Sequence, residues 1–431
     1  MRLAQPASLQ APALDIMNFL NEVTLWYPSA ISFAPGRPTE QFFEVEKALN
    51  HLSDYAAYLA EQRRESLPTV LNQLGQYQRT NGIINDLIGR FLAQDEGIQV
   101  SSEAIMLTDG CQEGMTILLA GLFERGTDVL LVIDPTYTGI TGIAAALNIE
   151  VYPVPSREDT LDFEKLEASL QEIRAAGKRP RALYITPDFN NPLGSSLSRA
   201  DRSRLLDLAV QAELLLFEDN AYGMFTYEAE PVPTLKALDR HGVVVYLGTF
   251  SKLLFPSLRL GFLLADQEVV TPKGTIHSLA EELSKIKSFT TLNTSALIQG
   301  IAGGVLLANA CSLRQSIQHK VAFYRENRDE MLRCLEQHFR ADPLLAETVS
   351  WNRPEGGFFL SMKLPFPFTG EQMRHCARDY GVICCPTTFF SLLGRCQNFV
   401  RLSFSYVSPA EIQEGILRFW RFIHDQVRAS E

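Results

Sequence analysis

Short, almost entirely apolar segments alternate with amphipathic stretches through the middle of the chain. The apolar segments predict buried strands over residues 105–108, 128–133, 150–154, 181–186, 214–218, 243–247 and 260–265. Between them, apolar residues recur at helical spacing over residues 114–123, 139–147, 161–176 and 198–212. Strands that are apolar on both faces and alternate with helices are typical of a parallel sheet covered on both sides. The pattern therefore predicts an α/β fold.

Helical patterns also occupy both flanks of this central region. Residues 14–35 begin as a helix and end in a short apolar strand, and residues 41–74 predict one or two further helices. Residues 310–340 predict one long helix. The 431 residues suffice for two domains at ~100–200 residues each. We expect an N-terminal arm that belongs to a small domain, a large domain, and a linking helix followed by the rest of the small α/β domain, at residues 1–45, 46–309 and 310–431.

Composition and charge argue against several classes of protein. The net charge of -11 disfavours a surface that binds nucleic acid or an anionic membrane. No apolar run approaches the ~18 residues that a membrane span needs, and residues 1–19 lack the apolar core of a signal peptide. The seven cysteines have no metal-ligand spacing, and such a scattered, odd set is typical of free thiols in a reducing compartment. We therefore expect a cytoplasmic protein with no metal site and no nucleic-acid or membrane partner.

Residues 248–261 hold a single lysine, Lys252, in a run of apolar and small residues where a strand ends. Burial of an ammonium group lowers its pKa toward that of a nucleophilic free amine, which can form a Schiff base with a carbonyl. Thr249, Ser251 and Arg259 add two hydroxyls and a fixed cation, a set suited to a phosphate. An aldehyde that also carries a phosphate is pyridoxal 5′-phosphate (PLP). An ordinary surface turn is the alternative reading of this stretch taken alone.

The segment Ser251-Lys252, followed by Pro256-Ser257-Leu258-Arg259-Leu260-Gly261, resembles the PLP attachment motif of fold-type I aminotransferases, class I/II. In that family the matching lysine holds the cofactor and the matching arginine binds its phosphate; Ser257 stands where the family usually has glycine. The resemblance covers nearly the whole chain. It implies a three-layer large domain with a mainly parallel sheet that binds PLP, a smaller α/β C-terminal domain, and a homodimer with shared active sites.

Several further candidates follow predicted strands, where ligands of parallel sheets bind. Asp109, Gly110 and Cys111 open a helix whose backbone amides can hold a phosphate. Tyr137 matches the family's aromatic residue that stacks on the cofactor ring. In Gln76-Tyr77, ahead of a glycine segment, Tyr77 matches the tyrosine that reaches the phosphate of the neighbouring subunit; a simple packing role is the alternative.

Three residues match the family's contacts to the cofactor ring. Asn191, in Asn191-Pro192-Leu193-Gly194, matches the asparagine of an Asn-Pro-x-Gly motif that donates to the phenolic oxygen, and we also expect it beside the substrate. Asp219 matches the aspartate paired with the ring nitrogen, and Tyr222 the tyrosine bonded to the phenolic oxygen. A carboxylate is required because a protonated ring nitrogen makes the ring an electron sink. Each residue alone is also compatible with a cap, a turn or a core position.

Arg401 and the loop around Gly36 and Arg37 are candidates for substrate binding. An arginine inside an apolar strand needs an anionic partner, and in the family the residue matching Arg401 forks onto the substrate α-carboxylate; a buried structural ion pair is the alternative. In the family the Gly-x-Pro loop lies over the substrate, and Arg37 replaces its usual small or apolar middle residue. We expect Arg37 to select the substrate side chain, unless it pairs with Glu40 or Glu44.

The sequence thus predicts a PLP-dependent aminotransferase that moves an amino group between an amino acid with an aromatic or acidic side chain and a 2-oxo acid. Within the family, three segments look most like aminotransferases that make hydroxyphenylglycines for natural products, and aminoadipate and kynurenine aminotransferases are more distant likenesses. The alternatives are another PLP reaction at Cα, namely elimination, γ-replacement, cyclisation or oxidation, and a binding module that kept the fold without catalysis. The intact lysine and aspartate argue against the second.

Overall fold

The computed structural model describes residues 12–157, 160–227 and 230–429, so the first eleven residues of the predicted arm lie outside it. A seven-stranded sheet forms the centre of the large domain, in the order β2-β8-β7-β6-β5-β3-β4. Its strands are parallel except β8, which runs antiparallel to both neighbours. Their bounds are β2 (Ile105–Thr108), β3 (Asp128–Asp134), β4 (Glu150–Pro155), β5 (Arg179–Ile185), β6 (Leu215–Asn220), β7 (Val244–Thr249) and β8 (Gly261–Leu264).

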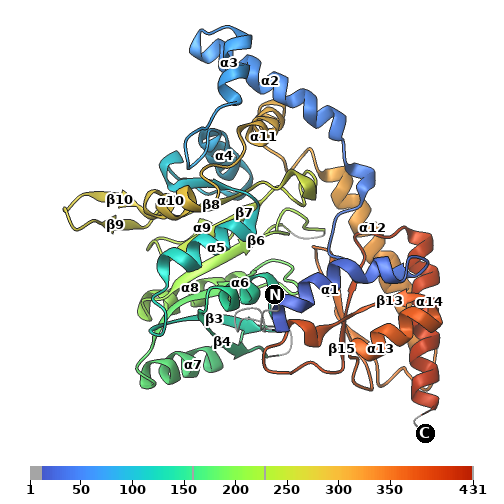
Figure 1. Ribbon diagram of the computed structural model, residues 1–431. Coiled ribbons are helices and arrows are strands. Elements are labelled where there is room, and N and C mark those ends of the chain that lie inside the picture. Colours follow the sequence, from blue (N-terminus) through green and yellow to red (C-terminus); the bar gives the residue numbers. More distant parts are fainter. Residues whose placement is uncertain (1–11, 158–159, 228–229, 430–431) are drawn as a thin grey trace, which may run out of the picture.

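Helices cover both faces of this sheet, because successive apolar strand residues point to opposite sides. In β3, Leu130 and Val132 pack with α5, α6 and α10, whereas Val129 and Leu131 pack with α7 and α8. These helices span α5 (Cys111–Leu122), α6 (Thr138–Ala146), α7 (Phe163–Ala175), α8 (Arg199–Gln211) and α10 (Leu279–Thr290). The predicted three-layer α/β domain with a mainly parallel sheet is confirmed (Figure 1).

A second, antiparallel sheet lies in the C-terminal part of the chain, in the order β11-β12-β15-β14. The N-terminal segment joins this region, since β1 pairs in parallel with β13. The bounds are β1 (Ile31–Ser32), β11 (Ser350–Trp351), β12 (Phe359–Lys363), β13 (Val382–Ile383), β14 (Cys385–Pro386) and β15 (Phe399–Ser403), with helices α1 (Pro12–Trp26), α12 (Gln318–Leu335), α13 (Gly370–His375) and α14 (Pro409–Arg428). Figure 1 shows α12 beside α14, on the side of the molecule that holds the small sheet.

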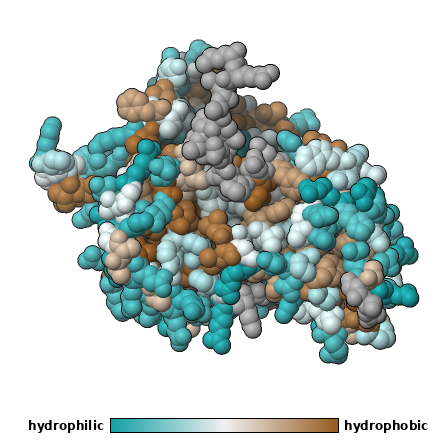
Figure 2. Space-filling view, turned by 60° about the horizontal axis from the view of Figure 1, so that its bottom comes forward, coloured by the Kyte–Doolittle hydropathy of each residue, from teal (hydrophilic) through white to brown (hydrophobic). Residues whose placement is uncertain are grey.

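The remaining elements form the upper part of the molecule in Figure 1 and a projecting hairpin. They are α2 (Val45–Arg63), α3 (Leu67–Leu74), α4 (Asn85–Phe91), α11 (Ala296–Ala308), β9 (Glu268–Val270) and β10 (Ile276–Ser278). The short α9 (Leu235–Leu238) packs instead beside α8 on the large sheet. Figure 2 shows hydrophobic residues on part of the projection at its left. In the hairpin, Val270 and Ile276 are exposed. Within the described parts of the chain, every helix is too short or too polar to span a bilayer.

Two predicted helices differ in extent from the structure. The long helix expected over 310–340 begins only at Gln318 and continues past Leu335 as a π-helical turn to Arg340. The chain before it turns sharply, with Ala310 and Cys311 in the left-handed region of backbone conformation. The helix expected from residue 114 begins at Cys111, directly after β2. The domain boundaries themselves stay a prediction.

Candidate active site

A cavity of about 320 Å³ opens at the carboxyl edge of the large sheet, between that edge, the N-terminal loop and the small domain. Loops that follow the parallel strands supply most of its walls, as expected for this kind of sheet. Among the candidates from the sequence, its lining contains Gly36, Arg37, Cys111, Tyr137, Asn191, Asp219, Tyr222, Thr249, Ser251, Lys252, Arg259 and Arg401. Asp109, Gly110 and Tyr77 are not among the residues that line it.

Lys252 stands in the turn after β7, with its amine inside the cavity. Its Nζ atom donates to the backbone carbonyl of Gly36, at 2.9 Å. Burial, reinforced by the guanidinium of Arg259, lowers the pKa of Lys252 to about 8, although the carboxylate of Asp219 opposes this shift. The free amine, which is the form that attacks a carbonyl, is therefore a minor fraction at neutral pH and becomes the major form at mildly basic pH.

Asp219 lies near the end of β6 and is almost fully buried. Tyr184 Oη donates to its Oδ2 atom at 2.5 Å, and Cys111 Sγ lies 3.8 Å from Oδ1. Burial raises the pKa of Asp219 to about 6, while these two hydrogen bonds and the charge of Lys252 hold it lower than burial alone would. The result is an ionisable carboxyl, fixed in direction, at the floor of the cavity.

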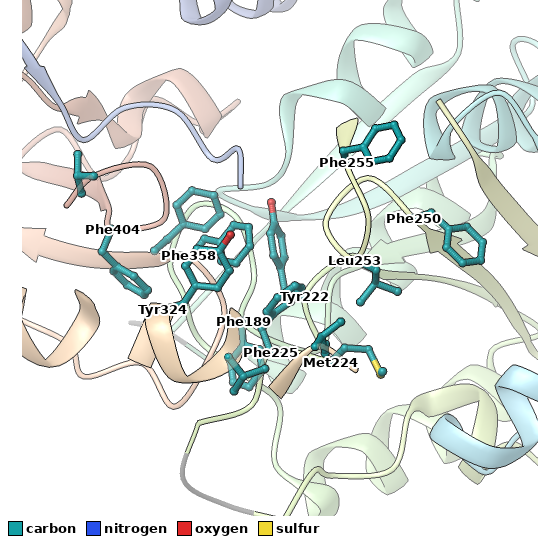
Figure 3. Packing of buried hydrophobic residues seen from close by; sticks show 14 of the residues in the cluster. Phe189, Tyr222, Met224, Phe225, Phe250, Leu253, Phe255, Tyr324, Phe358 and Phe404 are labelled. Carbon is teal, nitrogen blue, oxygen red and sulfur yellow. The ribbon is translucent and has the colours of Figure 1, made fainter. Parts of the chain in front are cut away.

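Aromatic rings form two further walls. Tyr222 packs edge-on against Phe358 and Phe359, with ring centroids 5.4 and 5.6 Å apart. Figure 3 shows its hydroxyl pointing away from this packed cluster. Burial raises the pKa of Tyr222, so the phenol stays protonated and can donate. Tyr137 follows β3, and burial raises its pKa to about 12.

A cationic corner lies where the first turn of α5 meets the turn after β7. Arg259 adopts the left-handed backbone conformation, and its guanidinium packs so closely on Gly110 that a Cβ atom there would lie 2.2 Å from Nη2. Thr249 Oγ1 accepts the amide of Ser251 at 3.1 Å. Gly110 therefore borders this corner through Arg259 although it does not line the cavity. The backbone amide of Asp109 donates to Glu113 Oε2 at 2.6 Å, and its side chain bonds to Thr294.

Arg401 enters the cavity from β15 of the small sheet and is nearly completely buried. Its guanidinium lies between the rings of Phe359 and Phe390, 4.5 and 4.8 Å from their centroids. Nη1 donates to Asn191 Oδ1 at 2.5 Å and Nη2 donates to the carbonyl of Ala34, while the buried Nε has no hydrogen-bond partner among the described residues. Neither partner carries charge, so the buried cation is not neutralised by a neighbouring acid. The structural ion pair considered for Arg401 is not formed with either of these partners.

Three backbone carbonyls of the loop over the cavity accept hydrogen bonds from side chains. The carbonyls of Ala34, Gly36 and Arg37 accept bonds from Arg401, Lys252 and Ser405 respectively. The Arg37 guanidinium lies 3.9 Å from the centre of the Tyr406 ring, whose hydroxyl donates to Glu40.

No ion pair of Arg37 with Glu40 or Glu44 occurs among the described residues, so the pairing considered as the alternative is replaced by stacking. Arg37 is exposed at the mouth of the cavity. The direction of the Arg37 side chain is set by its backbone bond to Ser405 and by the ring of Tyr406.

Comparison with known proteins places this geometry in a family. The family described as aminotransferase class I and II matches residues 55–419. The chain belongs to the class I and II aminotransferases. The (S)-3,5-dihydroxyphenylglycine transaminase of Amycolatopsis orientalis is 41% identical to this aminotransferase over 421 residues, which cover 98% of this chain and 94% of that protein.

Solved structures agree over nearly the full length. The kynurenine aminotransferase of Pyrococcus horikoshii, in complex with PMP, matches with a TM-score of 0.82 at 28% identity and covers 99% of this chain and 98% of its own. LysN, an α-aminoadipate aminotransferase of Thermus thermophilus complexed with N-(5′-phosphopyridoxyl)-L-leucine, matches with a TM-score of 0.78 at 27% identity, over 98% and 97%. The aminotransferase is accordingly a PLP-dependent enzyme of fold type I.

The donor set of the cavity fits PLP. A phosphate needs hydroxyls, a cation and free amides, which the cationic corner offers. A pyridine nitrogen needs a fixed carboxylate, and an aldehyde needs an amine with a lowered pKa; Asp219 and Lys252 answer these two requirements. The unpartnered Nε of Arg401 leaves one buried donor for an acidic group of the substrate.

Some lining residues could not be found from the sequence. Tyr184, which orients Asp219, looks like one more apolar member of β5. Thr24 comes from α1, and Phe390 comes from a short 3₁₀ helix (Thr387–Phe390) of the small domain. No local motif marks either, because each reaches the cavity only through the packing of distant segments.

Proposed function

We propose that this aminotransferase binds PLP through Lys252 and moves amino groups between an amino acid with a polar aromatic side chain and a 2-oxo acid. The observation that supports this most directly is that one cavity holds the amine of Lys252, the carboxyl of Asp219 and the unneutralised guanidinium of Arg401. These three groups are suited to an aldehyde, a pyridine nitrogen and a carboxylate, respectively. A preference for polar aromatic donors is supported by the similarity to a dihydroxyphenylglycine transaminase.

In this proposal each cavity residue contacts the part of the cofactor that suits its side chain. Asp219 pairs with the ring nitrogen, and Asn191 and Tyr222 donate to the phenolic oxygen. Tyr137 stacks on the ring. Thr249, Ser251, Arg259 and the first-turn amides of α5 at Cys111 hold the phosphate; Gly110 and Asp109 shape that turn. When bound, PLP supplies an electron sink that allows the Cα–H bond of the amino acid to break.

Lys252 then acts as the general base. Its Nζ atom takes the proton from the substrate Cα and returns it to the acceptor position on the same face. The pKa of about 8 suits this exchange, because a base whose pKa lies near the working pH both accepts and releases the proton. Contact between Nζ and the carbonyl of Gly36 also places the amine beneath the loop that covers the substrate.

Arg401 binds the α-carboxylate in this proposal. Two of its nitrogens are already fixed by Asn191 and by the carbonyl of Ala34, and the two flanking rings hold the guanidinium plane. The remaining donors of the fork can therefore meet a carboxylate with little loss of side-chain entropy. Gly36 allows the loop to approach, since a Cβ atom at this position would lie 2.3 Å from the Phe359 ring.

Arg37 selects the far end of the substrate. The guanidinium stands at the mouth of the cavity on a fixed backbone, where it can donate to a phenolic hydroxyl or a side-chain carboxylate. Arg37→Met should lower kcat/KM for a hydroxylated aromatic donor about tenfold and leave that for phenylalanine within about twofold. Tyr406→Phe is the matched control, because it keeps the ring beneath Arg37 and removes only the bond to Glu40.

Direct transfer tests the proposed activity. Purified enzyme is incubated with ¹⁵N-labelled amino acids and 2-oxoglutarate, and mass spectrometry follows the label into glutamate. We expect fast transfer from aromatic donors with polar rings and no transfer by Lys252→Ala. Ammonia and an unsaturated or cyclised product without labelled glutamate would show another PLP reaction and refute transamination with this acceptor.

We further propose a cytoplasmic homodimer in which Tyr77 completes the neighbouring site. Tyr77 is 76% exposed and does not line the cavity of its own chain, so a role at the phosphate requires a second subunit. All seven cysteines are free, which suits a reducing compartment. The sedimentation coefficient of the purified enzyme gives the oligomeric state.

A further inference from the structure

Helix α12 carries four buried polar side chains on one face. Lys320, Tyr324, Asn327 and Arg328 are separated by four, three and one residues, which places them along a single stripe of the helix. They are all at least nine-tenths buried. Polar side chains are rarely placed in this way unless each one satisfies a particular buried group.

Each of these side chains holds the backbone of a different segment around the active site. Asn327 Nδ2 donates to the carbonyls of Phe404 and Val407, just beyond the strand that carries Arg401, at 2.9 and 2.7 Å. Arg328 donates to the carbonyl of Pro354 at 2.6 Å.

The other two bind backbone groups close in sequence to the cavity residues Arg37 and Lys252. Tyr324 Oη accepts the amide of Thr39, two residues beyond Arg37, at 3.3 Å. Lys320 Nζ donates to the carbonyl of Leu253 at 2.6 Å, one residue beyond Lys252. Tyr324 and Leu253 both belong to the packed cluster shown in Figure 3.

The bond from Lys320 supplies a donor that the backbone does not. Among the described residues no backbone amide donates to the carbonyl of Leu253, and a buried carbonyl without a donor is costly. Burial lowers the pKa of Lys320 to about 8, and the nearby Glu44 opposes this shift, so the side chain remains mostly cationic at neutral pH. A charged donor makes a stronger bond than a neutral one.

We propose that Lys320 is a positioning residue for catalysis: it fixes the turn that carries Lys252 to the helix that also holds the substrate-binding segments. The amine of Lys252 thereby keeps a constant place relative to Arg37 and Arg401. This inference rests on the proposed function only in taking Lys252 as the catalytic lysine.

Three variants separate this role from simple stability. Lys320→Met keeps the length of the side chain and removes the donor. Lys320→Arg restores a donor, and a cavity of about 400 Å³ beside Lys320, Leu253 and Glu44 has room for the larger head group. Lys236→Met is the matched control, because Lys236 is equally buried but bonds to Asp266, at 2.6 Å, away from the Lys252 turn.

The first measurement is hydrogen exchange of the amide of Leu254, which donates to Phe250 within the Lys252 turn at 2.9 Å. We expect exchange about tenfold faster in Lys320→Met and near the wild-type rate in Lys320→Arg and Lys236→Met. The second is the single-turnover reaction with an amino acid. Lys320→Met should lower its rate at saturation about tenfold or more and leave the half-saturating amino acid concentration within about twofold.

Equal behaviour of Lys320→Met and Lys236→Met in both measurements would overturn the proposal. So would a Lys320→Arg variant that is folded and as slow as Lys320→Met. The proposed function is tested separately, by identifying the lysine that holds the cofactor. Amide exchange in the turn does not depend on that result, so the two failures can be told apart.

Discussion

Replacing Arg401 by lysine tests the substrate end of the cavity. Lysine keeps the positive charge, but a single ammonium cannot reach Asn191, the carbonyl of Ala34 and a substrate carboxylate at once. The variant should therefore lose one charge-assisted hydrogen bond to the substrate, worth about 1.5–3 kcal/mol. At about 1.36 kcal/mol for each factor of ten, kcat/KM for amino acids should fall about ten- to a hundredfold.

The assay compares an aromatic amino acid with the amine that lacks only its carboxylate. The half-reaction is followed by the change in cofactor absorbance under single-turnover conditions for both compounds. We expect the amine to react with wild type and Arg401→Lys at rates within about threefold, because Arg401 has no group to bind in it. An equal loss for amine and amino acid would refute the reasoning, and would mean that Arg401 supports the cavity walls through Phe359 and Phe390.

Three further predictions concern the cofactor side of the cavity. Asp219→Asn should keep the fold yet lower kcat at least about a hundredfold, measured by amino transfer; near-normal kcat would mean that another group supports the ring nitrogen. In the cofactor-free protein, competitive acylation of Lys252 should rise with pH around a midpoint near 8, because only the free amine reacts and a lowered pKa moves that rise to lower pH; a midpoint near that of the exposed lysines would contradict burial of the amine. Mixing inactive Tyr77→Ala and Lys252→Ala subunits should restore part of the activity, whereas no recovery after verified subunit exchange would count against a shared site.

The parts of the fold that could be predicted are those where local sequence and burial agree. Strands apolar on both faces, such as β3 and β7, can only be stable inside a covered sheet, and their carboxyl ends then define where ligands bind. Lys252 and Arg401 were recognisable because a charge inside an apolar segment needs a reason. Both reached the same cavity.

Other features depend on packing between distant segments. α11 is small and apolar all round, so it lacks the polar contrast that marks a helix; its glycines let it pack on α2, and a Cβ atom at Gly304 would lie 2.0 Å from the carbonyl of His51. Tyr184 and Lys320 carry no local signal of their partners, which are 35 and 67 residues away. α10 was not predicted either, although the structure shows a capping box of Ser278 and Glu281 at its start.

Chemical trapping of the cofactor on its lysine tests the central claim most directly. The purified enzyme is reconstituted with PLP, reduced with borohydride and digested, and the peptide that carries the added pyridoxyl group is identified by mass spectrometry. The account predicts a single labelled site at Lys252, and no label there once a tightly bound amino acid has converted the cofactor before reduction. A label on Lys287, Lys320 or any other lysine would contradict it.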